Sequence, residues 1–285
     1  MSVDMQRVRS APSVQEDVIW GHAEIILYSL AIGFGRDELE RAELPFVYEG
    51  AGLRCTPTFA HTLPSASTWD APGLVMANAI LVESELEIYS PLLPADEVAL
   101  TTQLKEAFDP GDQSGIYLIH RTEARRQHDN RALFSMTQTR RVRGQHGNDI
   151  SGEPQRAPAV DFPERDADFV MLVDVPDEQS ALYRLCGDFN PIYINPDAAH
   201  RAGFERPILP AECLQGIACR SVLATVCDYD TTLIRAIAAR VCAPVYAGDQ
   251  LRVSMWQDGP VISYRIFVPA RESLVLDNGR CVLTS

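Results

Sequence analysis

The sequence predicts an α+β protein made of two copies of one unit, each combining a helix with an antiparallel sheet. Three short segments of the first half recur in the second half in the same order, at nearly constant offsets of 155, 150 and 153 residues between their first positions. Apolar and polar residues also alternate in several stretches, as in half-buried strands. The recurring pairs are residues 27–30 with 182–185, 57–59 with 207–209, and 91–98 with 244–251.

In the first half, the pattern predicts one helix and four strands. Residues 1–18 mix charge with proline, so we expect a disordered arm or a loose edge segment there. Apolar residues at helical spacing predict a helix over 24–35, ending at Gly33 and Gly35. The predicted strands are 81–88, 97–104, 116–125 and 132–142.

A polar stretch, 144–165, separates the two halves. It is rich in glycine, proline and charge and has no periodicity, which is typical of a linker. We therefore expect a first domain over 1–143 and a second over 166–285.

The second half ends in four predicted strands with turns between them. Asp-Gly and Asn-Gly pairs are strong hairpin signals. The strands are expected at 234–242, 250–257, 261–268 and 274–283, with turns at 247–249, 258–259 and 277–279.

The stretch 182–220 is the most informative part of the chain. Gly187 and the Asn190-Pro191 pair force a non-helical turn, which displays the carboxylate of Asp188. Asn195 is a good N-cap for a short helix that runs to Gly203. A longer helix follows Pro207, with one buried apolar face. The sequence therefore places a carboxylate on a rigid turn close to the start of a buried helix.

Here the chain resembles the MaoC-like, or hydratase 2, family of (R)-specific enoyl-CoA hydratases and dehydratases. The family pattern reads tyrosine-arginine-leucine-serine-glycine-aspartate, then asparagine-proline-leucine-histidine, glycine-phenylalanine, and proline-isoleucine-leucine-histidine-glycine. The resemblance covers nearly the whole chain and implies a double hotdog fold, in which each sheet wraps around one helix. The matching residues are Tyr183, Arg184, Leu185, Gly187, Asp188, Asn190, Pro191, Gly203, Phe204, Pro207, Ile208 and Leu209.

The resemblance also implies the site residues. Asp188 matches the catalytic aspartate, which in the family shares one water with a histidine. Tyr193 stands in place of that histidine, and Pro210-Ala211 replaces the histidine-glycine pair. Ala211 would then supply the backbone N–H that polarises the thioester carbonyl.

Tyr193 cannot replace a histidine as a base, because a phenol has an ordinary pKa of about 10. Glu212, at the helix start where a carboxylate is favoured, is the best substitute. We therefore expect Asp188, Tyr193 and Glu212 to be catalytic. Gly187 and Asn190 are expected to shape the turn or contact the substrate.

Composition restricts the partners. The formal net charge of −14 argues against nucleic acid and anionic membranes, so coenzyme A phosphates need a local basic cluster. Arg206, Arg235 and Arg240 are candidates. No signal peptide is visible, and the seven cysteines form no C-x-x-C pair, which favours reduced thiols in a cytoplasmic protein. We expect a homodimer, no metal, and no cofactor apart from the coenzyme A of the substrate.

The functional hypothesis is a hydratase or dehydratase acting on an enoyl or 3-hydroxyacyl thioester of coenzyme A or an acyl carrier. Because the offset places Gly33 opposite Asp188, we expect the second half to hold the only site and the first half to shape an acyl pocket. Two alternatives stay open: another reaction on the same scaffold, such as thioester hydrolysis, isomerisation or ring formation, and a catalytically silent subunit that binds acyl thioesters.

Overall fold

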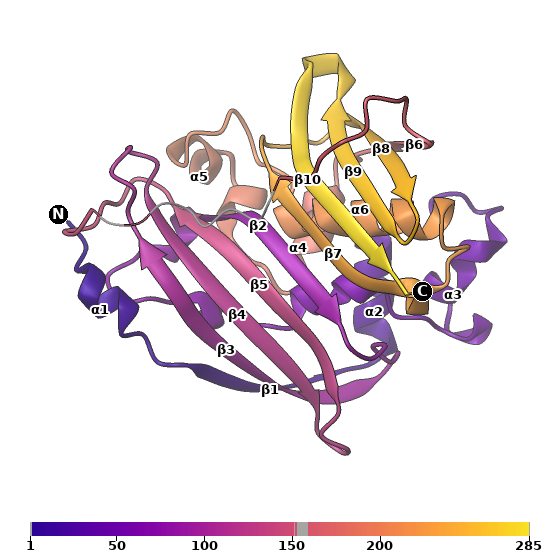
Figure 1. The fold of residues 1–285 in the computed structure, drawn as a ribbon, viewed down its shortest axis with the longest axis horizontal. Coiled ribbons are helices and arrows are strands. Elements are labelled where there is room, and N and C mark those ends of the chain that lie inside the picture. Colours follow the sequence, from indigo (N-terminus) through magenta and orange to yellow (C-terminus); the bar gives the residue numbers. More distant parts are fainter. Residues whose placement is uncertain (1, 151, 153–158, 285) are drawn as a thin grey trace.

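A single antiparallel sheet of ten strands runs through the molecule (Figure 1), in the order β1-β3-β4-β5-β2-β7-β10-β9-β8-β6. The computed structural model describes residues 2–150, 152 and 159–284. The strands are β1 (Val14–Trp20), β2 (Ala79–Ile88), β3 (Asp96–Phe108), β4 (Ile116–Arg126), β5 (Ala132–Val142), β6 (Phe169–Asp174), β7 (Ile234–Val241), β8 (Gln250–Asp258), β9 (Val261–Val268) and β10 (Ser273–Leu283).

The strand order reads the same from both edges once the two halves are matched. β1, β3, β4, β5 and β2 correspond in order to β6, β8, β9, β10 and β7. The halves meet where β2 pairs with β7, with Leu86 opposite Ile237. The sequence repeat is thus a structural repeat about a central pseudo-twofold axis, and the α+β class is confirmed.

The same symmetry relates two of the helices. α2 contains the repeat segment 27–30, α4 contains residues 182–184 of its counterpart, and the two helices pack against each other. The rings of Tyr28 and Tyr183, which are equivalent positions, lie 6.0 Å apart. The helices are α1 (Met5–Arg9), α2 (His22–Ala31), α3 (Leu44–Val47), α4 (Gln179–Arg184), α5 (Pro196–Arg201) and α6 (Ala211–Thr225). No helix among the described residues is long and apolar enough to cross a bilayer.

The two halves differ in what covers the concave face of their sheet. In the second half α6 is buried against β7, β8 and β9. In the described part of the first half, the equivalent segment forms only 3₁₀ turns: η3 (Pro57–Thr62), η4 (Ala66–Trp69) and η5 (Met76–Asn78). Such short turns fill less space than a helix of 15 residues, so a cavity remains beneath them.

The structure decides one open sequence prediction and corrects two others. In the described part of residues 1–18, Asp4 caps α1, and β1, which begins at Val14, is the edge strand beside β3, so an edge segment is confirmed and a disordered arm is not. The helix predicted over 24–35 ends at Ala31, where the chain turns. The predicted turn at 277–279 lies inside β10 as a bulge. Asn278 there has a φ of 55°, so the Asn-Gly pair bends a strand and makes no hairpin.

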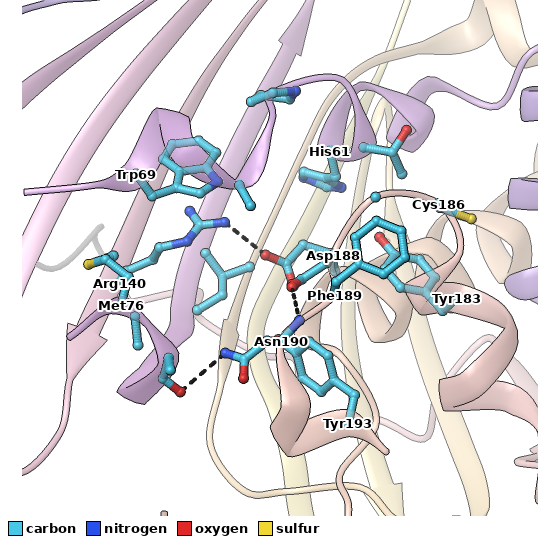
Figure 2. Close-up of a pocket in the computed structure, with 18 of the residues that line it drawn as sticks. His61, Trp69, Met76, Arg140, Tyr183, Cys186, Asp188, Phe189, Asn190 and Tyr193 are labelled. Carbon is cyan, nitrogen blue, oxygen red and sulfur yellow. Dashed lines mark hydrogen bonds and ion pairs between the residues drawn. The ribbon is translucent and has the colours of Figure 1, made fainter. Parts of the chain in front are cut away.

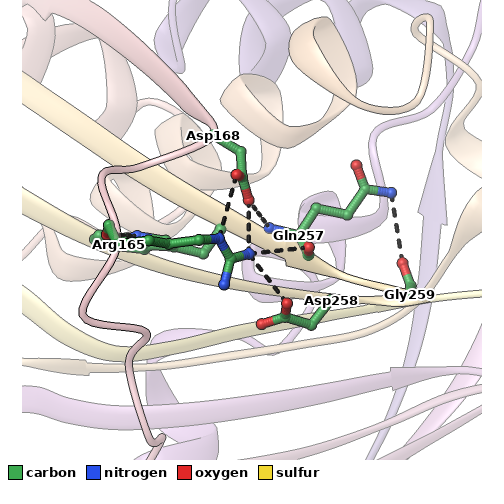
Figure 3. A network of polar contacts seen from close by, with 6 residues as sticks. Arg165, Asp168, Gln257, Asp258 and Gly259 are labelled. Carbon is green, nitrogen blue, oxygen red and sulfur yellow. Dashed lines mark hydrogen bonds and ion pairs between the residues drawn. The ribbon is translucent and has the colours of Figure 1, made fainter.

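The segment that leads into β6 is fixed by charged side chains (Figure 3). The Arg165 guanidinium donates to Asp168 at 2.9 Å and to Asp258 at 3.0 Å. The Asp168 carboxylate also accepts a hydrogen bond from the backbone N–H of Gln257, at 2.8 Å. The chain therefore leaves the predicted linker at a defined point on β8. Residues 151 and 153–158 of that linker lie outside the described residues.

Gly216 of α6 lies where the end of α2 leaves no room for a side chain. A Cβ atom there would lie 2.4 Å from Ile32 Cγ2 and 2.8 Å from the Tyr28 hydroxyl. We expect Gly216→Ala to lower the free energy of unfolding by about 1–3 kcal/mol through overpacking, although alanine normally favours a helix. Gly21→Ala is the control, since its Cβ meets only Glu24, at 3.6 Å. Urea unfolding measures both, and a stabilised Gly216→Ala protein would contradict the packing argument.

Candidate active site

The turn before η6 (Pro191–Tyr193) holds Asp188 in place through backbone hydrogen bonds (Figure 2). Gly187 has a φ of +122°, which favours glycine. Asp188 Oδ1 accepts the Asn190 N–H at 3.1 Å, and Asn190 Oδ1 caps η6 by accepting the Ile192 N–H at 3.2 Å. Asn190 Nδ2 donates to the Ala77 carbonyl, at 3.3 Å, in the first half. Asn190 thus joins the turn to the opposite half of the molecule.

A cavity of about 330 Å³ lies in front of this turn, between the two halves. Asp188 comes from the turn, Tyr193 from η6 and Glu212 from the first turn of α6, and all three line the cavity. Gly187 and Asn190 line it as well. The structure therefore brings together five of the residues that the sequence singled out.

Glu212 forms a buried ion pair with a residue of the first half. Its Oε1 lies 3.0 Å from Arg140 Nη2 on β5, and the Glu212 side chain is 7% exposed. Glu212 Oε2 has no hydrogen-bond partner among the described residues. Two charges out of water cost several kcal/mol each, and their attraction offsets that cost only while both stay paired.

Burial and neighbouring charges raise the pKa of both Glu212 and Tyr193. Burial raises the pKa of Glu212, the charge of Arg140 lowers it, and the charge of Asp188 raises it again, with a net upward shift. Burial also raises the pKa of the Tyr193 phenol, and the carboxylates of Asp188 and Glu212 raise it further. Tyr193 is therefore a neutral hydrogen-bond donor, and Glu212 binds its proton more tightly than a solvated glutamate.

Arg140 is itself held by the first half. Its guanidinium stacks 3.8 Å from the centre of the Trp69 ring and donates to Gln138 Oε1 at 2.9 Å. His120 packs edge-on against Trp69. Desolvation, then the charge of Arg140, lowers the pKa of His120 to about 3, and the same causes lower that of His61 to about 3. Both imidazoles are thus neutral and do not compete with Arg140 for Glu212.

Sequence reasoning missed these first-half residues, because the offset argument confined the chemistry to the second half. A signal was present. Gln138 and Arg140 alternate along the strand predicted over 132–142, and His120 lies on 116–125, at positions where an apolar core residue is expected. Polar residues on the buried face of a strand indicate a lined cavity.

A second cavity, of about 410 Å³, adjoins the first. Leu81 and Tyr193 line both cavities and form the wall between them. Ala211, the first residue of α6, lines the second cavity, as does Arg240. Arg141 of β5 lines it too, and its Nε has no hydrogen-bond partner among the described residues.

The other two candidate arginines lie elsewhere. Arg206 is exposed and stacks 5.0 Å from the centre of the Tyr246 ring. Arg235 is exposed beside Tyr89, where it donates to the Ile88 carbonyl at the edge of a separate small hollow. Neither of these two arginines lines either cavity. Of the three arginines predicted to contact coenzyme A, Arg240 alone is a lining residue of one of the two cavities.

This set of groups suits proton transfer at carbon and oxygen. It offers two carboxylates of unequal surroundings, a phenol that stays protonated, and a helix N-terminus. Cys186 lines the first cavity, but burial raises the pKa of its thiol to about 12, which makes it a poor nucleophile. Among the described residues, no three His, Cys, Asp or Glu side chains are grouped as metal ligands.

The chain is similar in sequence to known proteins. The MaoC like domain model matches residues 158–271. A peroxisomal enoyl-CoA hydratase 2 from Arabidopsis thaliana is 30% identical over 274 residues, which cover 90% of this chain and 88% of the plant protein. Enoyl-CoA hydratase ChsH3 from Mycobacterium tuberculosis is 28% identical over 286 residues, 98% of each chain. The chain belongs to the MaoC-like, hydratase 2 family.

Solved structures agree on the fold. A MaoC-like dehydratase from Phytophthora capsici superposes with a TM-score of 0.84 at 23% identity, covering 99% of this chain and 98% of its own. A Mycobacterium tuberculosis protein described as a double hotdog has a TM-score of 0.63 at 13% identity, covering 99% of this chain and 98% of its own. The fold is a double hotdog, and the curated relatives are hydro-lyases.

We expect Arg140→Gln to lower the free energy of unfolding by about 3 kcal/mol, because it leaves Glu212 buried without a counterion. The loss should be largest at pH 8 and smaller at pH 5. A carboxyl group whose pKa is raised in the folded state stabilises that state at low pH, and this contribution is lost as the pH rises through the raised pKa. Removing Arg140 raises the pKa of Glu212 further, so more of the buried Glu212 is neutral at pH 5 than at pH 8.

Urea unfolding at the two pH values measures this effect, and Arg140→Gln/Glu212→Gln is the matched control. The double variant should regain most of the stability, because neither charge is then left alone. Equal losses for Arg140→Gln at pH 5 and pH 8 would show that Glu212 is not the source of the penalty.

Proposed function

We propose that this chain is a hydro-lyase that adds water to an enoyl thioester, or removes it from a 3-hydroxyacyl thioester, of coenzyme A. One observation carries the proposal: Asp188, Tyr193 and Glu212, from three separate elements, line one cavity between the halves. Membership of a family whose curated members include enoyl-CoA hydratases supports the reaction class.

In this proposal the thioester lies at the wall between the two cavities, beside Tyr193. The acyl chain occupies the first cavity, and the pantetheine arm leaves through the second. The carbonyl oxygen then faces the N-terminus of α6, where the Ala211 N–H has no intrahelical partner. Since C2 and C3 are only one and two bonds from the carbonyl carbon, they reach Asp188 and Glu212 on the other side of Tyr193.

The roles of the carboxyl groups follow from their surroundings. In dehydration, the Asp188 carboxylate takes a proton from C2. In the molecules in which Glu212 is protonated and its ion pair with Arg140 is neutralised, Glu212 gives its proton to the 3-hydroxyl group, the C3–O bond breaks, and water leaves. Hydration is the reverse. Glu212 is assigned the acid because its pKa is raised, and Tyr193, which stays protonated, donates a hydrogen bond to the water or hydroxyl oxygen.

For the carrier, Arg141 and Arg143 provide the local basic cluster that an acidic protein needs. Arg141 lines the second cavity, and Arg143 stacks 4.9 Å from the centre of the Phe204 ring. The pKa of Arg143 is lowered first by burial and then by the charge of Arg141, so the two cations lie close together. An anion between them would relieve this repulsion. We infer that they contact coenzyme A phosphates.

We expect Asp188→Asn to lower kcat for hydration of crotonyl-CoA, or of a longer enoyl-CoA, by about 10²- to 10⁴-fold, because the acid–base group is lost. Glu212→Gln should lower kcat and remove the fall of dehydration rate at high pH. Asp197→Asn, on the exposed side of α5, is the control and should match the parent protein.

Turnover is measured from the ultraviolet absorbance of the conjugated enoyl thioester. A parallel assay with a thiol reagent measures the release of free coenzyme A. Full activity in Asp188→Asn would refute the proposed base. Thiol release without hydration would replace the lyase reaction by thioester hydrolysis.

Arg141→Ala and Arg143→Ala should each raise KM for a coenzyme A thioester about 10-fold and change kcat little, since a hydrogen bond to a charged group contributes roughly 1.5–3 kcal/mol. The same variants should leave KM unchanged for the matching N-acetylcysteamine thioester, which has no phosphates. Arg235→Ala, at the separate hollow, is the control. An equal rise in KM for both substrates would exclude phosphate contact.

A further inference from the structure

The concave faces of the two half-sheets differ in the polarity of their buried residues as well as in the elements that cover them. In the second half the buried residues that face α6 are apolar, apart from the ring of Tyr264, whose hydroxyl donates to the Ala238 carbonyl. In the first half a row of polar residues crosses three neighbouring strands. Gln138 of β5 pairs with Ser84 of β2 on one side and with His120 of β4 on the other. All three are buried.

This polar row is costly unless something compensates for it. A buried polar atom without a hydrogen bond destabilises the folded state, because it has lost its hydrogen bonds to water. Gln138 Nε2 and His120 Nδ1 have no partner among the described residues. The second half shows that the same architecture tolerates aliphatic residues on this face. Packing alone therefore does not explain the polar residues. One contact between the row and the first cavity is the hydrogen bond that Gln138 accepts from Arg140, which lines the cavity.

Two polar side chains line the cavity on this side, and one of them contacts the polar row. His61 of η3 lines the cavity, and its Nε2 lies 3.1 Å from Ser84 Oγ. Tyr183 of α4 also lines the cavity, is 2% exposed, and has a hydroxyl without a hydrogen-bond partner among the described residues. Burial first, and then nearby groups including Glu212, raises the pKa of Tyr183, so the phenol stays a neutral donor.

The charges around the cavity exclude an anionic acyl tail. Asp70, Asp188 and Glu212 all line the cavity, whereas Arg140 is its single lining cation among the described residues. Arg140 is already paired with Glu212. A carboxylate or phosphate on the tail would therefore meet a net negative wall, whereas a neutral oxygen could accept a hydrogen bond from a phenol.

We propose that the acyl group taken by the first cavity carries a neutral oxygen, a keto or hydroxyl group beyond C3, and that the Tyr183 hydroxyl binds it. This inference rests on the proposed hydro-lyase function and names the substrate class for the same cavity. A water molecule at the same polar atoms is the competing explanation, and the two differ in substrate selectivity.

The test compares trans-2-octenoyl-CoA with isomers that carry a keto oxygen at C5, C6 or C7. We expect one keto isomer to exceed the plain substrate about 10-fold in kcat/KM, as one buried hydrogen bond contributes about 1–1.5 kcal/mol. Tyr183→Phe, which deletes only the hydroxyl, should bring this ratio close to one. Tyr28→Phe is the matched control, because Tyr28 is the equivalent position, is equally buried and does not line the cavity.

Equilibrium binding of the saturated octanoyl and oxo-octanoyl thioesters, measured by calorimetry, separates this inference from the proposed function. Equal kcat/KM and equal affinity for plain and keto compounds would overturn the inference while leaving the hydro-lyase function in place. A keto preference in binding without any turnover would support the inference and count against the lyase reaction. A preference that survives Tyr183→Phe would overturn the assignment to this hydroxyl.

Discussion

The buried ion pair between Arg140 and Glu212 connects the two halves at the point where the candidate chemistry lies. Arg140 comes from β5 of the first half and Glu212 from the first turn of α6, and their 3.0 Å contact forms part of the cavity wall. The pair keeps one carboxyl oxygen fixed and leaves the other without a partner among the described residues. Because a buried charge is costly alone, the position of Glu212 depends on the first half being docked correctly.

The repeat explains the symmetry of the molecule, and the difference between its two copies explains where the candidate site lies. Equivalent strands are arranged about the β2–β7 contact, and the equivalent Tyr28 and Tyr183 face each other. The second half fills its sheet with α6. The first half replaces that helix with short 3₁₀ turns, which leaves a cavity and a polar row behind it. The two copies of the fold thus differ: one has a helix packed against its sheet, and the other has a cavity at the equivalent place.

The electrostatics of the candidate site are set by burial and by a small number of charged side chains. Desolvation raises the pKa of Glu212 and the charge of Arg140 lowers it, while His61 and His120 stay neutral beside the same arginine. Tyr193 contributes a proton donor that does not ionise near neutral pH. This combination separates the two carboxyl groups by environment, which is how a pair of like residues takes opposite acid and base roles.

The sequence by itself determined the repeat, most of the strands, and the turn that displays Asp188, because these depend on local periodicity and on glycine and proline geometry. It also placed Tyr193 and Glu212 in one motif. Only the tertiary structure decided that 277–279 bends a strand, since its neighbours in the sheet override a local turn signal. Tertiary structure also decided that Arg140 pairs with Glu212, 72 residues away, and that Arg235 lies far from the site. No local pattern encodes such contacts, because they arise when the halves pack against each other.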